Sequence, residues 1–182
     1  MAVIAVIGSP RSGGNSETIV DAVLAGAKEN GKTVKKYNLN KMKIIGCQAC
    51  MGCKKTGKCV QKDDMVALLE DIKTAEAIVV SSPIYFGQPS AQFRMFQDRT
   101  YSLFDMEFKS FVPEGKKIVS VVTCGSGADK ANEVAGVMEG AFVNLMKMTS
   151  VDKIILAGGG PPNVAAGNKD VLAKAKAAGK KL

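Results

Sequence analysis

The sequence predicts an α/β protein in which a doubly wound sheet of five parallel strands carries helices on both faces. Short continuous apolar runs, such as AVIAVIG, are typical of strands buried on both faces of a parallel sheet. Segments with apolar residues at helical spacing alternate with these runs. A chain of 182 residues with 46% hydrophobic content suits one domain with a sizeable core. We therefore expect residues 1–182 to form a single domain.

The predicted elements follow one another as strand, loop and helix. The first strand covers 2–8, and apolar residues at helical spacing predict a helix over 16–30. Asp63 or Asp64 would cap the second helix, and Pro89 would lie in the first turn of the third. The other strands are expected at 32–39, 75–83, 116–124 and 151–158, and the other helices at 63–75, 89–104, 128–148 and 168–181.

The loop after the first strand has the composition of an anion-binding loop. Its sequence, GSPRSGGNS, combines backbone N–H groups and a helix N-terminus with hydroxyl, amide and guanidinium side chains. It matches neither the P-loop nor the G-x-G-x-x-G pattern, and the alternative is a turn that only caps the helix. The predicted phosphate ligands are Ser9, Arg11, Ser12, Asn15 and Ser16.

Two more loops are expected at the same edge, because the carboxyl ends of parallel strands lie together. SSPIYFGQPS would offer an apolar wall to an aromatic ring system, or else contact a neighbouring subunit. TCGSG would allow close backbone approach and polar contacts, or form a short turn. The candidate residues are Pro83, Ile84, Tyr85, Phe86, Gly87, Thr123, Cys124, Gly125 and Gly127. Together, the three loops suit a ligand with a phosphate end and a broad aromatic end, as in FMN.

A loop is expected at 41–62. A stretch of thirteen residues inside it contains four of the five cysteines: Cys47, Cys50, Cys53 and Cys59. Bacterial ferredoxins use C-x2-C-x2-C spacing for three cluster ligands, and Cys59 could supply the fourth. Structural zinc usually takes two separated C-x2-C pairs, which this loop lacks. A [4Fe-4S] cluster is therefore the favoured interpretation. Zinc and free thiols remain alternatives, and a disulfide is the least favoured.

Charge and composition narrow the range of partners. The net charge is +8, yet aromatic residues make up only 5% and no nucleic-acid-binding motif appears, so we expect no nucleic-acid partner. No signal peptide or membrane-length apolar run is visible, which predicts a cytoplasmic protein. The six lysines between Lys41 and Lys62 would form a basic rim for an acidic electron carrier, or an ordinary solvated surface.

The chain contains no histidine, which excludes Ser-His and Cys-His nucleophilic mechanisms. Chemistry is therefore expected from a cofactor, and no catalytic side chain is predicted. Cys124 is more simply a small buried residue than a redox group.

The three loops resemble those of the NAD(P)H-dependent FMN reductase branch of the flavodoxin-like proteins. The matching motifs are G-S-P-R-x-x-G-N-[ST], S-P-[IV]-Y-[FW]-G and T-x-G-x-G, which occur in that order along nearly the whole chain. Within this branch, the four cysteines and the following Asp63, Asp64 and Met65 resemble the iron-sulfur flavoproteins. The cysteine loop of that family carries a [4Fe-4S] cluster.

This resemblance implies FMN and a [4Fe-4S] cluster as cofactors, with NAD(P)H as a candidate donor. It also implies a homodimer or homotetramer in which electrons pass between the flavin and the cluster. The expected function is electron transfer between a ferredoxin-like carrier and an acceptor. The alternatives are a cluster-free NAD(P)H-dependent FMN or quinone reductase, and a non-catalytic FMN-binding interaction module.

Overall fold

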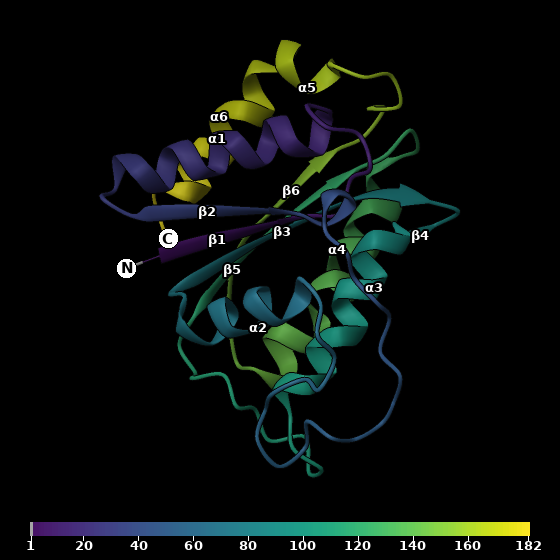
Figure 1. The fold of residues 1–182 in the computed structure, drawn as a ribbon. Helices are drawn as coiled ribbons and strands as arrows, with labels where there is room; N and C mark the ends of the chain where they lie inside the picture. The colour runs from purple at the N-terminus through teal and green to yellow at the C-terminus, as the bar shows by residue number, and fades with distance from the viewer. Residues whose placement is uncertain (1) are drawn as a thin grey trace.

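The computed structural model describes residues 2–182 and contains a parallel sheet between two layers of helices (Figure 1). The parallel strands run in the order β2-β1-β3-β5-β6, so the strand order reverses between β1 and β3. Their bounds are β1 (Ala2–Ile7), β2 (Thr33–Asn38), β3 (Ala77–Tyr85), β5 (Lys117–Thr123) and β6 (Thr149–Leu156). The predicted α/β class and parallel sheet are confirmed.

A sixth strand corrects the prediction of five. β4 (Gln88–Pro89) pairs antiparallel with the end of β3, so that Ile84 lies opposite Pro89 and Tyr85 opposite Gln88. The turn between them has positive φ at Phe86 (49°) and Gly87 (76°), as a two-residue hairpin turn of type I′ requires. Pro89 lacks an N–H but is tolerated because β4 is a short edge strand.

The helices divide between the two faces of the sheet (Figure 1). One face is covered by α1 (Asn15–Glu29), α5 (Val164–Gly167) and α6 (Lys169–Gly179), and the other by α2 (Met65–Thr74), α3 (Ala91–Arg99) and α4 (Ala128–Gly140). Each face has its own buried apolar cluster, because the strands carry apolar side chains on both sides. Among residues 2–182, no helix is both long and apolar enough for a membrane crossing.

The third predicted helix begins later and ends earlier than expected. The Ser90 hydroxyl accepts a hydrogen bond from Phe93 N at 3.2 Å and caps α3, while Pro89 belongs to β4. After Arg99 the chain tightens into the 3₁₀ turn η2 (Thr100–Leu103). Similarly, the fourth predicted helix changes at Gly140 into the π turn η3 (Ala141–Leu145).

The cysteines lie in the connection between β2 and α2. After the 3₁₀ turn η1 (Leu39–Lys41), residues 42–64 form neither helix nor strand. In Figure 1 this connection runs away from the sheet, and Lys54 within it contacts Tyr101 and Phe104, in and just after η2. We call residues 45–63 the cysteine segment. Its two ends contact Arg99, at the end of α3, and its middle contacts η2 and Phe104.

Candidate functional site

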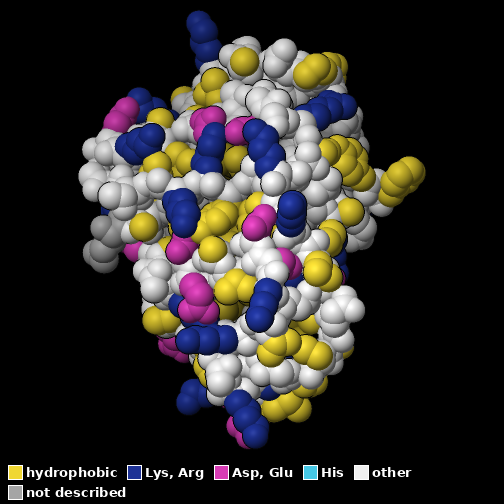
Figure 2. All heavy atoms as spheres, viewed as in Figure 1, with side chains coloured by type: hydrophobic (Ala, Val, Ile, Leu, Met, Phe, Trp, Pro, Cys, Tyr) yellow, Lys and Arg dark blue, Asp and Glu magenta, His cyan; other side chains and the backbone are white. Residues whose placement is uncertain are grey.

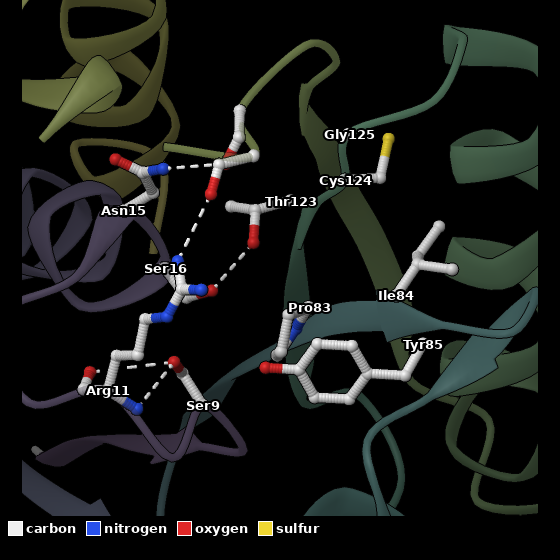
Figure 3. A pocket seen from close by; sticks show the side chains of 12 residues that line it. Ser9, Arg11, Asn15, Ser16, Pro83, Ile84, Tyr85, Thr123, Cys124 and Gly125 are labelled. Carbon is white, nitrogen blue, oxygen red and sulfur yellow. Dashed lines mark hydrogen bonds between the residues drawn. The ribbon is translucent and has the colours of Figure 1, made fainter. Parts of the chain in front are cut away.

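A cavity opens at the carboxyl ends of β1, β3 and β5, where the strand order reverses (Figure 3). Its volume is about 430 Å³ including the open mouth. The lining residues are Ser9, Arg11, Asn15, Ser16, Pro83, Ile84, Tyr85, Thr123, Cys124, Gly125, Gly159 and Gly160. All three predicted loops therefore meet here, although Ser12, Phe86, Gly87 and Gly127 do not line the cavity.

The loop before α1 forms the polar side of this cavity. Ser9 Oγ accepts a hydrogen bond from Arg11 N at 3.2 Å, which turns the loop toward the helix. The Arg11 guanidinium extends across to Gly160, whose carbonyl oxygen it contacts at 3.1 Å (Figure 3). The first N–H groups of α1 have no partner within the helix and carry its positive dipole end. An arginine, two hydroxyls and the start of a helix thus line one side of the cavity, a combination that favours anion binding.

A carboxylate stabilises the outer side of the same loop. Glu17 Oε2 accepts a hydrogen bond from Gly13 N at 2.8 Å, and Glu17 Oε1 lies 2.8 Å from Lys36 Nζ. These contacts, with that to Lys36 the strongest, lower the pKa of Glu17 below its usual value. The loop is therefore fixed before any ligand binds.

Asn15 does not face the open part of the cavity as a free ligand. Its side-chain amide donates to Gly159 O and Pro161 O, both at 2.8 Å, and its oxygen accepts from Ala165 N at 3.0 Å. The described contacts show Asn15 holding a fourth loop, residues 157–163, against the first. This loop was not predicted as part of the site, and its one signal in the sequence is the glycine- and proline-rich stretch GGGPPNVAAGN.

The loop after β5 joins the first and fourth loops. Thr123 Oγ1 lies 2.9 Å from Ser16 Oγ, and the backbone of Cys124 exchanges hydrogen bonds with Leu156 O and Gly159 N. The Cys124 thiol donates to Ser126 O at 3.3 Å within its own loop. Its buried side chain therefore serves the loop, which agrees with the simpler interpretation of this residue.

The apolar side of the cavity comes from the end of β3. Pro83 and Ile84 are partly buried, and the Tyr85 ring lies beside Pro83 with its hydroxyl toward the first loop (Figure 3). Phe86 and Gly87 form the hairpin turn, and the Phe86 side chain is fully exposed. Of the residues predicted for the apolar wall, Pro83, Ile84 and Tyr85 line the cavity, whereas Phe86 and Gly87 do not.

A second cavity is lined by Cys47, Cys50, Cys53 and Cys59 together, and occupies about 330 Å³ including its mouth. Among residues 2–182, no three Cys, Asp or Glu side chains are close enough to form a finished metal site. All five cysteines are free thiols. Burial raises the pKa of the Cys53 thiol, and the neighbouring Cys59 and Cys50 act in the same direction. The four thiols therefore share a cavity but are not preset as metal ligands.

Arg99 closes the cysteine segment from the end of α3. Its guanidinium donates to both carboxylate oxygens of Asp63, at 2.5 and 2.9 Å, and to Ile45 O at 2.6 Å. Asp63 also accepts from Ile45 N at 2.9 Å. Burial would raise the pKa of Asp63, but these bonds, above all that to Arg99, lower it. Both ends of the segment are thereby fixed to one buried cation.

Lys54 corrects part of the predicted basic rim. Its side chain is buried, donates to Tyr101 O at 2.9 Å and Phe104 O at 3.0 Å, and lies 3.1 Å from the Tyr101 ring centre. Two carbonyls and an aromatic face compensate the buried ammonium group. Lys54 therefore anchors the middle of the cysteine segment to η2. The other predicted rim lysines are exposed: Lys41, Lys43, Lys55, Lys58 and Lys62.

Helix α3 connects the two cavities. Ser90, at its start, donates to Gly8 O at 2.6 Å beside the first cavity, while Arg99, at its end, lines the cysteine cavity. Nine helical residues span about 14 Å at 1.5 Å per residue. Within one chain, the two cavities thus lie at opposite ends of α3.

The chain is similar in sequence to several curated iron-sulfur flavoproteins. An iron-sulfur flavoprotein of Archaeoglobus fulgidus is 33% identical over 138 residues, which cover 76% of this chain and 60% of that protein. An iron-sulfur flavoprotein of Methanocaldococcus jannaschii is 38% identical over 103 residues, covering 57% and 53% respectively. The chain therefore spans between about half and three fifths of these relatives' lengths.

Solved structures show the same fold at lower identity. An NAD(P)H:quinone oxidoreductase from Methanothermobacter marburgensis superimposes with a TM-score of 0.78 at 19% identity, covering 100% of this chain and 95% of that one. A flavodoxin from the domain Archaea gives a TM-score of 0.56 at 20% identity, with the same coverage of both chains. At such identities these structures establish the flavodoxin-like fold alone.

The family model that matches describes the NADPH-dependent FMN reductases and aligns with residues 1–161. These residues include all four loops of the first cavity up to Pro161, and the whole cysteine segment. The resemblance to iron-sulfur flavoproteins of this group is confirmed by the curated relatives. The chain belongs to the NADPH-dependent FMN reductases, a family of oxidoreductases.

Proposed function

We propose that this chain is an FMN-dependent redox protein with FMN in the cavity at the sheet edge and a [4Fe-4S] cluster in the cysteine cavity. The observation that carries the proposal is that all four clustered cysteines line one cavity, which is separate from the cavity at the sheet edge. When bound, FMN supplies one- and two-electron chemistry, and the cluster supplies single-electron transfer. The protein's task is to hold both groups and to set their surroundings.

The first cavity fits the two ends of FMN. Arg11, the Ser9 hydroxyl and the N-terminal turn of α1 would hold the phosphate. Pro83, Ile84 and Tyr85 would cover one side of the ring and exclude water from it. Thr123 and Gly125 lie where the polar edge of the ring would approach the backbone.

The second cavity is lined by the kind of side chains that ligate an iron–sulfur cluster. Four thiols are the ligands that a [4Fe-4S] cluster requires. A cluster with four thiolates is negatively charged, and the buried cations Arg99 and Lys54 would offset that charge. The names of the curated relatives support the same assignment.

A second candidate is a cluster-free NAD(P)H-dependent reductase of FMN or quinones. It is favoured by the thiols, which are not arranged as a finished metal site among residues 2–182. The quinone oxidoreductase fold neighbour is compatible with it, although its identity of 19% shows only the fold. A third candidate, a non-catalytic FMN-binding module, predicts tight FMN binding without turnover.

Anaerobic purification followed by counts of FMN, iron and acid-labile sulfide separates these candidates. We expect one FMN and about four irons per chain, with iron lost in Cys59→Ser and retained in the control Cys124→Ser. FMN without iron, together with rapid NADPH oxidation, would instead establish the cluster-free reductase.

We propose an acidic, ferredoxin-like carrier as the redox partner. Lys55 and Lys58 are exposed within the cysteine segment, and Ile45, Met51 and Val60 of the same segment are exposed apolar residues. Figure 2 shows basic, acidic and hydrophobic side chains interspersed over the lower part of the molecule, where this segment lies in Figure 1. Such a mixture suits a transient complex that is steered by charge.

The carrier is tested by charge reversal. Lys55→Glu with Lys58→Glu should slow reduction by a reduced ferredoxin and flatten its salt dependence, because both lysines attract the acidic partner. Lys28→Glu with Lys181→Glu reverses two exposed charges outside the cysteine segment and serves as the control. Equal rates for both double variants would exclude docking at this rim.

The placement of the two cavities also supports a homodimer or homotetramer. About 14 Å of helix α3 separates them in one chain, so an approach between subunits would shorten the path from flavin to cluster. Sedimentation of the holoprotein tests this, and a monomer at micromolar concentration would contradict it.

A further inference from the structure

Arg99, at the end of α3, is unusual because it is buried: only 1% of it is exposed, whereas arginine side chains usually lie at the surface. A buried guanidinium is retained only where its charge and its N–H groups find partners. Two of its nitrogens have them: one contacts Ile45 O and Asp63 Oδ2, and the other contacts Asp63 Oδ1. Ile45 precedes all four cysteines, and Asp63 follows them. The cation therefore closes the cysteine segment at its two ends.

The third nitrogen of Arg99 has no such partner. Within the part of the chain that the structure describes, the Nε–H group is buried and makes no hydrogen bond. Arg99 lines the same cavity as the four cysteines. Burial would lower the pKa of Arg99, but the hydrogen bond to Asp63 and the charge of Cys59 raise it. A fully buried donor thus lies in a cavity whose prospective acceptors are sulfur atoms.

We propose that Arg99 is a positioning residue for the cluster site: it fixes both ends of the cysteine segment, and its Nε–H donates to the Cys59 thiolate of the bound cluster. This inference rests on the proposed function. Hydrogen bonds to cluster sulfurs and nearby positive charge both raise the reduction potential, because they stabilise the more negative reduced state. Arg99 therefore combines loop closure with control of the potential.

The test compares Arg99→Lys with Arg94→Lys. Lysine keeps the positive charge but lacks both the planar fork and an Nε–H group. Arg94 lies on the same helix, is exposed and contacts Gln97 and Asp98, so it controls for the substitution itself. In Arg99→Lys we expect unchanged FMN content, iron loss to a chelator about 10–100 times faster, and a lower cluster midpoint potential. Arg94→Lys should match the unaltered protein in all three measurements.

A second pair of variants allows for poor folding, because removing one partner of a buried ion pair is strongly destabilising. Asp63→Asn keeps Arg99 and weakens the closure, so iron loss should accelerate while the potential changes less than in Arg99→Lys. The double variant Asp63→Leu/Arg99→Met removes both charges and leaves neither unpaired. It should fold and bind FMN, yet lose iron faster and show the lower potential. Iron retention and potential that stay unchanged in Arg99→Lys and in the double variant would overturn the proposal.

Failure of the cluster assignment can be distinguished from failure of this inference. If the unaltered protein binds no iron after anaerobic reconstitution, the cluster in the proposed function is excluded. Hydrogen exchange of the iron-free chain then decides the role of Arg99. Faster exchange in Arg99→Lys confined to residues 45–63 supports closure by Arg99, and unchanged exchange overturns it.

Discussion

Ser16 and Thr123 hold their hydroxyl oxygens 2.9 Å apart, although 107 residues separate them in the sequence. Ser16 lies in the first turn of α1, and Thr123 is the last residue of β5. Both are buried, and both line the predicted FMN cavity. This hydrogen bond therefore fixes the distance between the start of α1 and the loop after β5.

Thr123→Val should weaken FMN binding about tenfold and destabilise the protein by about 1 kcal/mol, since valine keeps the shape but leaves the Ser16 hydroxyl without its partner. FMN titration and urea unfolding measure the two effects. Thr74→Val, at the exposed end of α2, is the control and should change neither. A loss of stability with unchanged FMN affinity would show that the Ser16–Thr123 pair serves the fold alone.

Asn15→Asp should have a larger effect on FMN binding, in the range of 10–100-fold. A carboxylate cannot donate to Gly159 O and Pro161 O, and its charge would repel the phosphate. FMN dissociation followed by fluorescence measures the loss. Asn132→Asp, on the exposed face of α4, adds the same charge away from the cavity and is the control. Equal FMN affinity in both variants would contradict the role of Asn15 in assembling the cavity.

The three predicted loops do meet at one cavity. The alternation of strands and helices predicts a doubly wound parallel sheet, and in such a sheet the loops after the strands lie together at the carboxyl edge. The role of Asn15 was hidden, since its partners lie 144 to 150 residues away and no local pattern marks them. From sequence, Asn15 was predicted as a phosphate ligand. In the structure its amide binds the fourth loop, which is why that loop was missed.

The segment after β3 fits two local preferences of proline, one for the first turn of a helix and one for a short edge strand. Pro89 was predicted at the start of a helix, where proline is favoured, but a short edge strand accepts it equally well. The deciding contact is the hairpin turn at Phe86 and Gly87, which brings Gln88 back to Tyr85. Lys54 was predicted as an exposed charge. Its burial could not be read from the local sequence, because the carbonyl groups of Tyr101 and Phe104 that accept its hydrogen bonds lie about 50 residues further on.

Asp71 should contribute to stability only above acidic pH. Burial would raise its pKa, but hydrogen bonds from Lys35 Nζ at 2.7 Å and Tyr37 Oη at 2.5 Å lower it below the unfolded value. The unfolded chain therefore binds the proton more readily, and stability falls as the pH drops from about 5 through the folded-state pKa. Asp71→Asn should cost about 1 kcal/mol at pH 7 and reduce the slope below pH 5. Urea unfolding across pH 3–7 measures both quantities, and an unchanged acid slope would contradict the prediction.

Gly57→Ala should destabilise the cysteine segment by more than the strain of placing alanine at a positive φ. Gly57 has φ of +66°, and an added Cβ would lie 2.8 Å from two atoms of the Phe111 ring. Gly31 has a similar φ of +73° but open space around it, so Gly31→Ala measures the backbone cost alone, about 1–2 kcal/mol. Gly57→Ala should lose more stability than this and should also release iron faster, because Gly57 lies between Cys53 and Cys59. Thermal unfolding and chelator kinetics measure the two effects. Equal stability losses in the two variants would show that Phe111 moves aside, and the faster iron release should then disappear as well.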